Sequence, residues 1–180
     1  MVFFGHLGIT TGIVKCFEKT THKNISLNDN STYDYRMVLI GSILPDIIDK
    51  PIGAFFFRST FHNTRIFAHT LLFSASLILL GIFLLLKKNS NKFLLLGAGT
   101  SIHLLLDSMW LYPGILLWPY FGLKFPVRTD SNWLGSDFYM LLHNPSYYIP
   151  EIIGFIIIAY YFLKLIKNKK IKEFLCKGNL

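Results

Sequence analysis

Residues 66–88 read IFAHTLLFSASLILLGIFLLLKK, an apolar stretch that ends in two lysines. The part from Ile66 to Leu86 is as long as the roughly 20 apolar residues that a helix needs to cross a bilayer. A second stretch of the same kind runs from Tyr147 to Ile166, with Glu151 near its start. The two stretches predict membrane-spanning helices and an all-α fold, and the dipole of the second helix would favour a negative charge at Glu151.

Three further apolar stretches are interrupted by charged residues, prolines or glycines. They run from about Phe3 to Phe17, from Met37 to Phe57 and from Phe93 to about Trp110. Interrupted helices of this kind usually face a bundle interior or a cavity. We therefore expect a polytopic bundle of four to five helices that forms a single membrane-embedded domain over residues 1–180.

Two segments outside these stretches have a different character. Residues 112–146 are rich in aromatic residues and prolines, which predicts an interfacial loop or short re-entrant elements, or else an ordinary loop with packed aromatics. The segment from Thr20 to Thr32 is rich in Asn, Ser and Thr, so we expect a loop in which His22 is solvated.

The composition supports a membrane protein. Hydrophobic residues make up 52% of the chain and charged residues 16%, whereas a soluble domain has about 25% charged residues. The net charge of +8 comes from basic residues at the ends of apolar stretches, so we expect the lipid bilayer and not nucleic acid as the partner. The two cysteines, Cys16 and Cys176, are too few for a disulfide framework.

Lysine and arginine are distributed unevenly between alternate connections, which predicts the orientation. The poorer set consists of Lys50, Arg58, Arg65, Lys124 and Arg128. The richer set consists of Lys15, Lys19, Lys23, Arg36, Lys87, Lys88, Lys92 and the lysines of the tail at 164–180. The richer side should be cytoplasmic, so the N-terminus starts outside the cell membrane and the C-terminus ends inside.

With this topology, ionisable residues of four apolar stretches come to the same depth on the outer side. His103 and Asp107 are four residues apart, as are Arg65 and His69, so each pair would share one helix face. An Asp or Arg in a span costs about 2.5–3.5 kcal/mol on the insertion scale, and a shared cation would compensate several of them. Histidine and carboxylate are ligands for zinc and related divalent ions. The whole set is His6, Asp46, Asp49, Arg65, His69, His103 and Asp107.

Other interpretations of these residues stay open. A histidine within a membrane segment is often a hydrogen-bonded packing residue, and Asp46 and Asp49, three residues apart, could cap a helix or lie in a solvated loop. His62 and His143 lie on the outer side and could join a site.

A family resemblance rests on five short segments. They are Gly5-His6, GSILPDIID at 41–49, RIFAHTLLF at 65–73, SIHLLLD at 101–107 and WPYFG at 118–122. Together they resemble the prokaryotic membrane-bound metal-dependent hydrolases, the YdjM-like family, over roughly residues 1–126. The order of His, Asp, His and HxxxD more distantly resembles zinc-dependent phospholipase C and the related fungal single-strand nucleases. That resemblance implies one or two zinc ions, with Asp46, His69, His103 and Asp107 as the primary ligands and His6 serving a second ion through Asp107.

The leading hypothesis is a membrane-bound hydrolase that uses a metal-activated water on a phosphoester or phospholipid-like substrate. Asp49 would orient or deprotonate that water, and Arg65 would clamp a phosphate oxygen. The first alternative is an ion, metal or proton transporter that uses the same His/Asp cluster. The second is a non-catalytic partner-binding membrane protein with a structural metal.

Overall fold

The computed structural model describes residues 3–24, 33–127 and 133–180, and every regular element in these ranges is a helix. The all-α prediction is therefore confirmed for the described chain. In order, the elements are α1 (Phe4–Asn24), α2 (Tyr35–Pro51), η1 (Ile52–Phe56), α3 (Arg58–Phe61), α4 (Leu71–Lys88), α5 (Lys92–Leu106), η2 (Met109–Leu111), α6 (Pro113–Leu116), α7 (Trp133–His143), α8 (Pro145–Lys167) and α9 (Ile171–Lys177).

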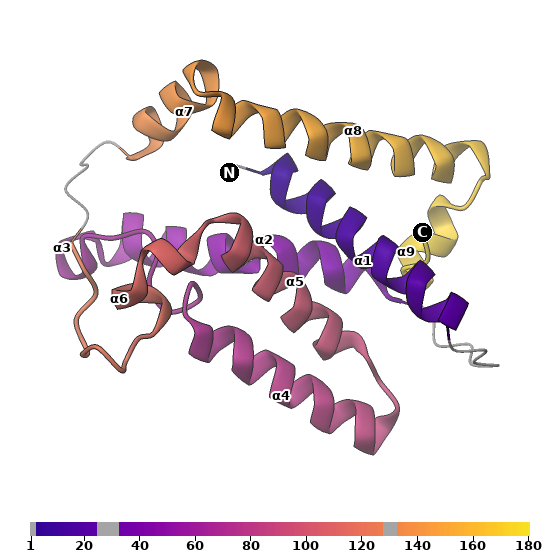
Figure 1. The fold of residues 1–180 in the computed structure, drawn as a ribbon, viewed down its shortest axis with the longest axis horizontal. Helices are drawn as coiled ribbons and strands as arrows, with labels where there is room; N and C mark the ends of the chain where they lie inside the picture. The colour runs from indigo at the N-terminus through magenta and orange to yellow at the C-terminus, as the bar shows by residue number, and fades with distance from the viewer. Residues whose placement is uncertain (1–2, 25–32, 128–132) are drawn as a thin grey trace.

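The five long helices pack in the order α8, α1, α2, α5, α4, so that α8 and α4 lie on opposite flanks (Figure 1). Glycines bring neighbouring helices into close contact. A Cβ atom on Gly8 would overlap the backbone of Gly154 where α1 meets α8, and one on Gly41 would overlap Leu96 where α2 meets α5. Small residues at such crossings are typical of helix packing in membranes, where backbones must approach closely to gain dispersion contacts.

Among the described residues, α4 and α8 are the two helices that are long and apolar enough to cross a membrane. Both expose large apolar side chains, for example Leu86 at 81% on α4 and Leu163 at 63% on α8. A core helix of a soluble protein would bury such side chains, so these faces fit lipid as the solvent. The predicted count of four to five spans goes beyond this finding. Helices α2 and α5 have only 17 and 15 residues, and α1 carries the charged residues Lys15, Glu18 and Lys19.

Several predicted boundaries were wrong. Helix α1 continues to Asn24, so the polar segment from Thr20 begins within a helix, and residues 25–32 of that segment lie outside the described residues. Helix α4 begins at Leu71 and not at Ile66, because the Thr70 hydroxyl caps it by accepting a hydrogen bond from Phe73 N at 3.1 Å. Within 112–146, the described residues form the short helices α6 and α7 and the connections around them. Their placement at the membrane interface stays a prediction.

The C-terminal segment folds back on the bundle (Figure 1). The Gly178 carbonyl accepts a hydrogen bond from Tyr35 N at 2.9 Å, and the Leu175 carbonyl accepts one from the Arg36 guanidinium at 2.7 Å. The basic tail is thus fastened to the start of α2.

Candidate metal site

Each residue of the cluster is placed by a different local feature. His6 lies in the first turn of α1, Asp46 lies in α2, and His103 lies in the last turn of α5. The first turn of α1 is itself held by Glu151 of α8, whose carboxylate accepts hydrogen bonds from the backbone N–H groups of Phe3 and Phe4. Glu151 was expected to interact with the dipole of its own helix. Instead it caps the N-terminus of α1, where unpaired N–H groups attract a carboxylate.

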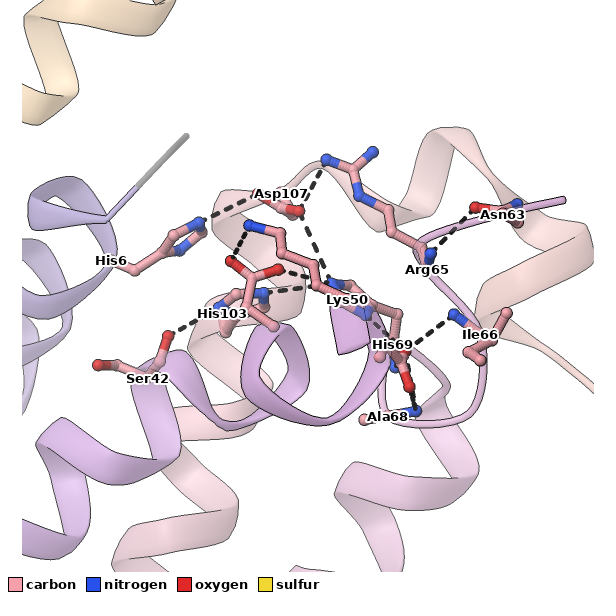
Figure 2. Close-up of polar contacts among 12 residues, drawn as sticks. His6, Ser42, Lys50, Asn63, Arg65, Ile66, Ala68, His69, His103 and Asp107 are labelled. Carbon is pink, nitrogen blue, oxygen red and sulfur yellow. Dashed lines mark hydrogen bonds and ion pairs between the residues drawn. The ribbon is translucent and has the colours of Figure 1, made fainter. Parts of the chain in front are cut away.

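The segment before α4 is organised by Asp49, which is fully buried. Its carboxylate accepts hydrogen bonds from the backbone N–H groups of Ile66, Ala68 and His69 at 2.8–3.1 Å (Figure 2). The His69 ring adds a fourth, from Nδ1 at 2.7 Å. These bonds replace the ones that a helix would have supplied, so Arg65 and His69 do not lie one turn apart on a helix as expected.

The two central histidines direct their Nε2 atoms toward each other, 3.4 Å apart (Figure 2). On the far side of each ring, Nδ1 has a partner: the Asp49 carboxylate for His69, and the Ser42 carbonyl at 2.7 Å for His103. A carbonyl can only accept, so His103 Nδ1 carries a proton, and its Nε2 is left with a lone pair. Such a partner on the second nitrogen is the usual arrangement around a metal-ligating histidine.

Carboxylates surround this pair. Asp46 Oδ1 lies 3.6 Å from His69 Nε2, and Asp46 Oδ2 accepts a hydrogen bond from Lys50 at 2.7 Å. Asp107 Oδ2 lies 4.0 Å from His69 Nε2 and 2.8 Å from Arg65 Nη2. Arg65 therefore pairs with Asp107, at the end of α5.

His6 completes the cluster from the opposite side. Its ring is fully buried and stacks on His103 with centroids 4.1 Å apart. Its Nε2 lies 3.1 Å from Asp107 Oδ1, but neither ring nitrogen makes a hydrogen bond of good geometry within the described chain. A buried imidazole whose nitrogens lack such hydrogen bonds is well placed to bind a metal ion or another group that is not part of the chain.

The donor set fits a zinc-sized divalent ion. Two tetrahedral ligands at the usual zinc distances lie about 3.3 Å apart, close to the 3.4 Å between the histidine Nε2 atoms and the 3.6 Å from His69 to Asp46. Ligand atoms fall within 4.8 Å of one another in two groups that share His103. These groups are His6, Asp46 and His103, and His69, His103 and Asp107.

The comparison with known families now decides the chain's membership. The family described as YdjM inner membrane protein matches residues 1–171. The chain belongs to this family. No curated protein and no solved structure matches it. The YdjM match extends well past residue 126, the end of the resemblance recognised in the sequence, and it places the protein in the inner membrane.

Within this YdjM family member, some predicted participants lie elsewhere. His62 and His143 are exposed and belong to neither ligand group. Asp49 was expected to act on water; in the structure its carboxylate accepts hydrogen bonds from backbone N–H groups and from the His69 ring. Sequence reasoning missed Lys50 as a partner of Asp46, although their spacing of four on one helix was a usable signal.

Proposed function

We propose that this YdjM family member is a metal-dependent hydrolase of phosphoesters. The observation that carries the proposal is the approach of two histidine Nε2 atoms, each ring anchored through Nδ1, beside the carboxylates of Asp46 and Asp107. Two facing lone pairs repel unless a cation or a proton lies between them, and the nearby carboxylates favour a cation. Zinc suits this mixture of imidazole and carboxylate ligands.

In this proposal His69, His103, Asp46 and Asp107 hold one ion, and His6 contributes to it or to a second ion through Asp107. A bound divalent ion lowers the pKa of a coordinated water toward 7 and polarises the scissile group. The protein contributes the orientation of the ligands: Asp49 fixes the His69 ring, and the Ser42 carbonyl fixes the His103 ring. Arg65, at the edge of the cluster, is placed to bind a phosphate oxygen of the substrate.

We further propose that the chain crosses the inner membrane more than once, with its C-terminus in the cytoplasm and the site toward the outer side. The support is the clustering of basic connections at one end of the bundle, where α1 ends, α4 connects to α5 and α8 connects to α9 (Figure 1). The residues of the candidate site lie away from that end.

Metal analysis of detergent-purified protein, paired with a phosphodiesterase assay, tests the function. We expect about one or two zinc ions per chain, hydrolysis of a generic phosphodiester, and loss of both after chelation with recovery on adding zinc back. Protein that binds no divalent ion under any condition would overturn the proposal. In that case a shared proton would explain the histidine pair, as in a proton-relaying transporter.

A further inference from the structure

A pocket of about 360 Å³ adjoins the candidate metal site and shares Arg65 with it. It is formed where four parts of the chain meet: the segment before α4, the region of α6, residues 126–127, and the start of α8. Its volume falls at the lower end of the range of about 300–1,000 Å³ typical of ligand sites, so it suits a compact polar group. The lining includes Asn63, Arg65, Tyr112, Val127 and Tyr147.

The wall of the pocket beside the metal site is held in place. Asn63, which is buried, accepts a hydrogen bond from Arg65 N at 3.0 Å and donates one to the Pro126 carbonyl at 2.8 Å. The Arg65 guanidinium reaches Asp107 on one side, and its Cζ lies 5.8 Å from the centre of the Tyr112 ring on the other. Arg65 thus forms the boundary between the pocket and the cluster, with its side chain 29% exposed.

The charges at this boundary favour an anion once a cation is bound. Three carboxylates, of Asp46, Asp49 and Asp107, lie beside two basic side chains, of Lys50 and Arg65. With neutral histidines, a divalent ion would give the cluster a net positive charge, and the cluster meets the pocket at Arg65. The Asp107 carboxylate, which pairs with Arg65, would also bind the ion, so its negative charge would be shared between the ion and Arg65. A guanidinium beside an ion of this kind matches the paired oxygens of a phosphate group.

We propose that this pocket binds the phosphate ester group of the substrate or product, with Arg65 as its anion contact and Tyr112 and Tyr147 as its walls. The inference rests on the proposed function for the role of the bound group, but the binding itself can be measured separately. A phospholipid headgroup and a soluble phosphate ester share this chemistry. Tyr147 lies in the first turn of α8, a candidate span with an exposed apolar surface, so a headgroup can reach the pocket from the lipid beside that helix.

The decisive variant is Val127→Trp, which fills the pocket from an exposed position. Leu123→Trp is its matched control, because Leu123 is equally apolar, 79% exposed and outside the lining. The zinc-loaded full chain is tested in two ways: equilibrium dialysis with glycerol 3-phosphate, and native mass spectrometry of bound lipid from nanodiscs containing phosphatidylglycerol. Each variant's metal content is measured in parallel.

We expect Val127→Trp to weaken binding by about tenfold or more, because the indole would occupy the space of the phosphate ester group, with metal content unchanged. Leu123→Trp should bind as the wild type does. If Val127→Trp weakens the binding of lipid, the pocket binds a headgroup. If it weakens only the binding of glycerol 3-phosphate, the pocket binds a soluble ester. Equal binding by both variants would overturn the pocket assignment even if the protein holds zinc and hydrolyses phosphodiesters. Absence of zinc from the wild type would instead count against the proposed function.

Discussion

Asp49 holds the His69 ring from behind, with its Oδ2 atom 2.7 Å from Nδ1 and both side chains fully buried. Asp49→Asn would replace one acceptor oxygen by an NH₂ group that faces backbone donors. We therefore expect lower thermal stability in detergent and roughly 10–100-fold weaker zinc binding, as is typical when a partner of a ligating histidine is lost. The control is Glu173→Gln, a carboxylate on α9 whose side chain is 39% exposed and which lies outside the ligand groups. Wild-type zinc affinity in Asp49→Asn would contradict this role.

His103 and Asp107 should act as a unit. His103→Ala removes an Nε2 atom from both ligand groups, and Asp107→Asn removes a carboxylate that contacts His6 and Arg65. Each change should lower bound metal and abolish hydrolysis, and the double variant should be little worse than either single one, since residues of one site are not additive. The measurements are zinc content and phosphodiesterase rate. Full zinc content and full activity in both single variants would end the metal hydrolase hypothesis.

The cluster was foreseen in the sequence because adjacent helices alternate in direction. That rule alone predicts that His6, Asp46, His69, His103 and Asp107 lie at one depth, and the structure brings all five together. The different contacts of Asp46 and Asp49 within the cluster were not predicted. A spacing of three does not reveal that Asp49 turns toward backbone N–H groups while Asp46 faces the histidines.

In the fold, too, the apolar pattern predicts which helices exist, but single contacts determine where they begin and how they pack. Apolar length identified α4 and α8, but the start of α4 depends on the Thr70 cap, which the apolar pattern conceals. The order of the layers depends on close contacts such as that between Gly8 and Gly154, which involve residues far apart in the sequence. The packing of α9 against α2 depends likewise on Arg36. In the sequence, this residue counted only as one of the basic residues that predict the orientation in the membrane.

Gly154 is predicted to matter for the site as well as for packing. A side chain there would collide with the Phe4 carbonyl and with Gly5, next to His6. Gly154→Leu should therefore separate α8 from α1, lower the melting temperature and reduce zinc binding by displacing His6. Gly12→Ala is the matched control, because its added Cβ would make an ordinary contact of 3.6 Å with Ile157. Zinc titration and thermal unfolding in detergent measure both effects; a Gly154→Leu protein with unchanged values would show that this crossing can adjust.

The attachment of α9 should depend on pH through Asp34. Its hydrogen bonds with the Arg36 guanidinium hold the pKa of this carboxyl below its usual range. A lowered folded-state pKa means that the stabilisation is complete above the unfolded value of about 3.9 and is lost as the pH falls through the folded value. The protection of the amides of residues 171–178 against hydrogen exchange, measured relative to their intrinsic rates at each pH, should therefore fall at low pH. Asp34→Asn should show low protection already at pH 7, and high protection at every pH in that variant would contradict the attachment.

The orientation can be tested with the protein's own cysteines. Cys16 on α1 and Cys176 on α9 are exposed and lie toward the end of the bundle that carries the basic connections. If that end is cytoplasmic, a membrane-impermeant maleimide should leave both unlabelled in intact cells and label them after permeabilisation.

A cysteine at the opposite end supplies the reciprocal test. Leu123→Cys, in a background of Cys16→Ser and Cys176→Ser, places one thiol at a position that is 79% exposed and belongs to the loop after α6. The proposed topology expects this thiol to react in intact cells, because the positive-inside rule puts the poorer set of basic residues, including Lys124, outside. Labelling of Cys16 and Cys176 in intact cells, with protection of the cysteine at 123, would reverse the orientation and turn the site toward the cytoplasm. The clustering of the His/Asp residues would survive that result, because it depends on the alternation of helix direction and not on its sign.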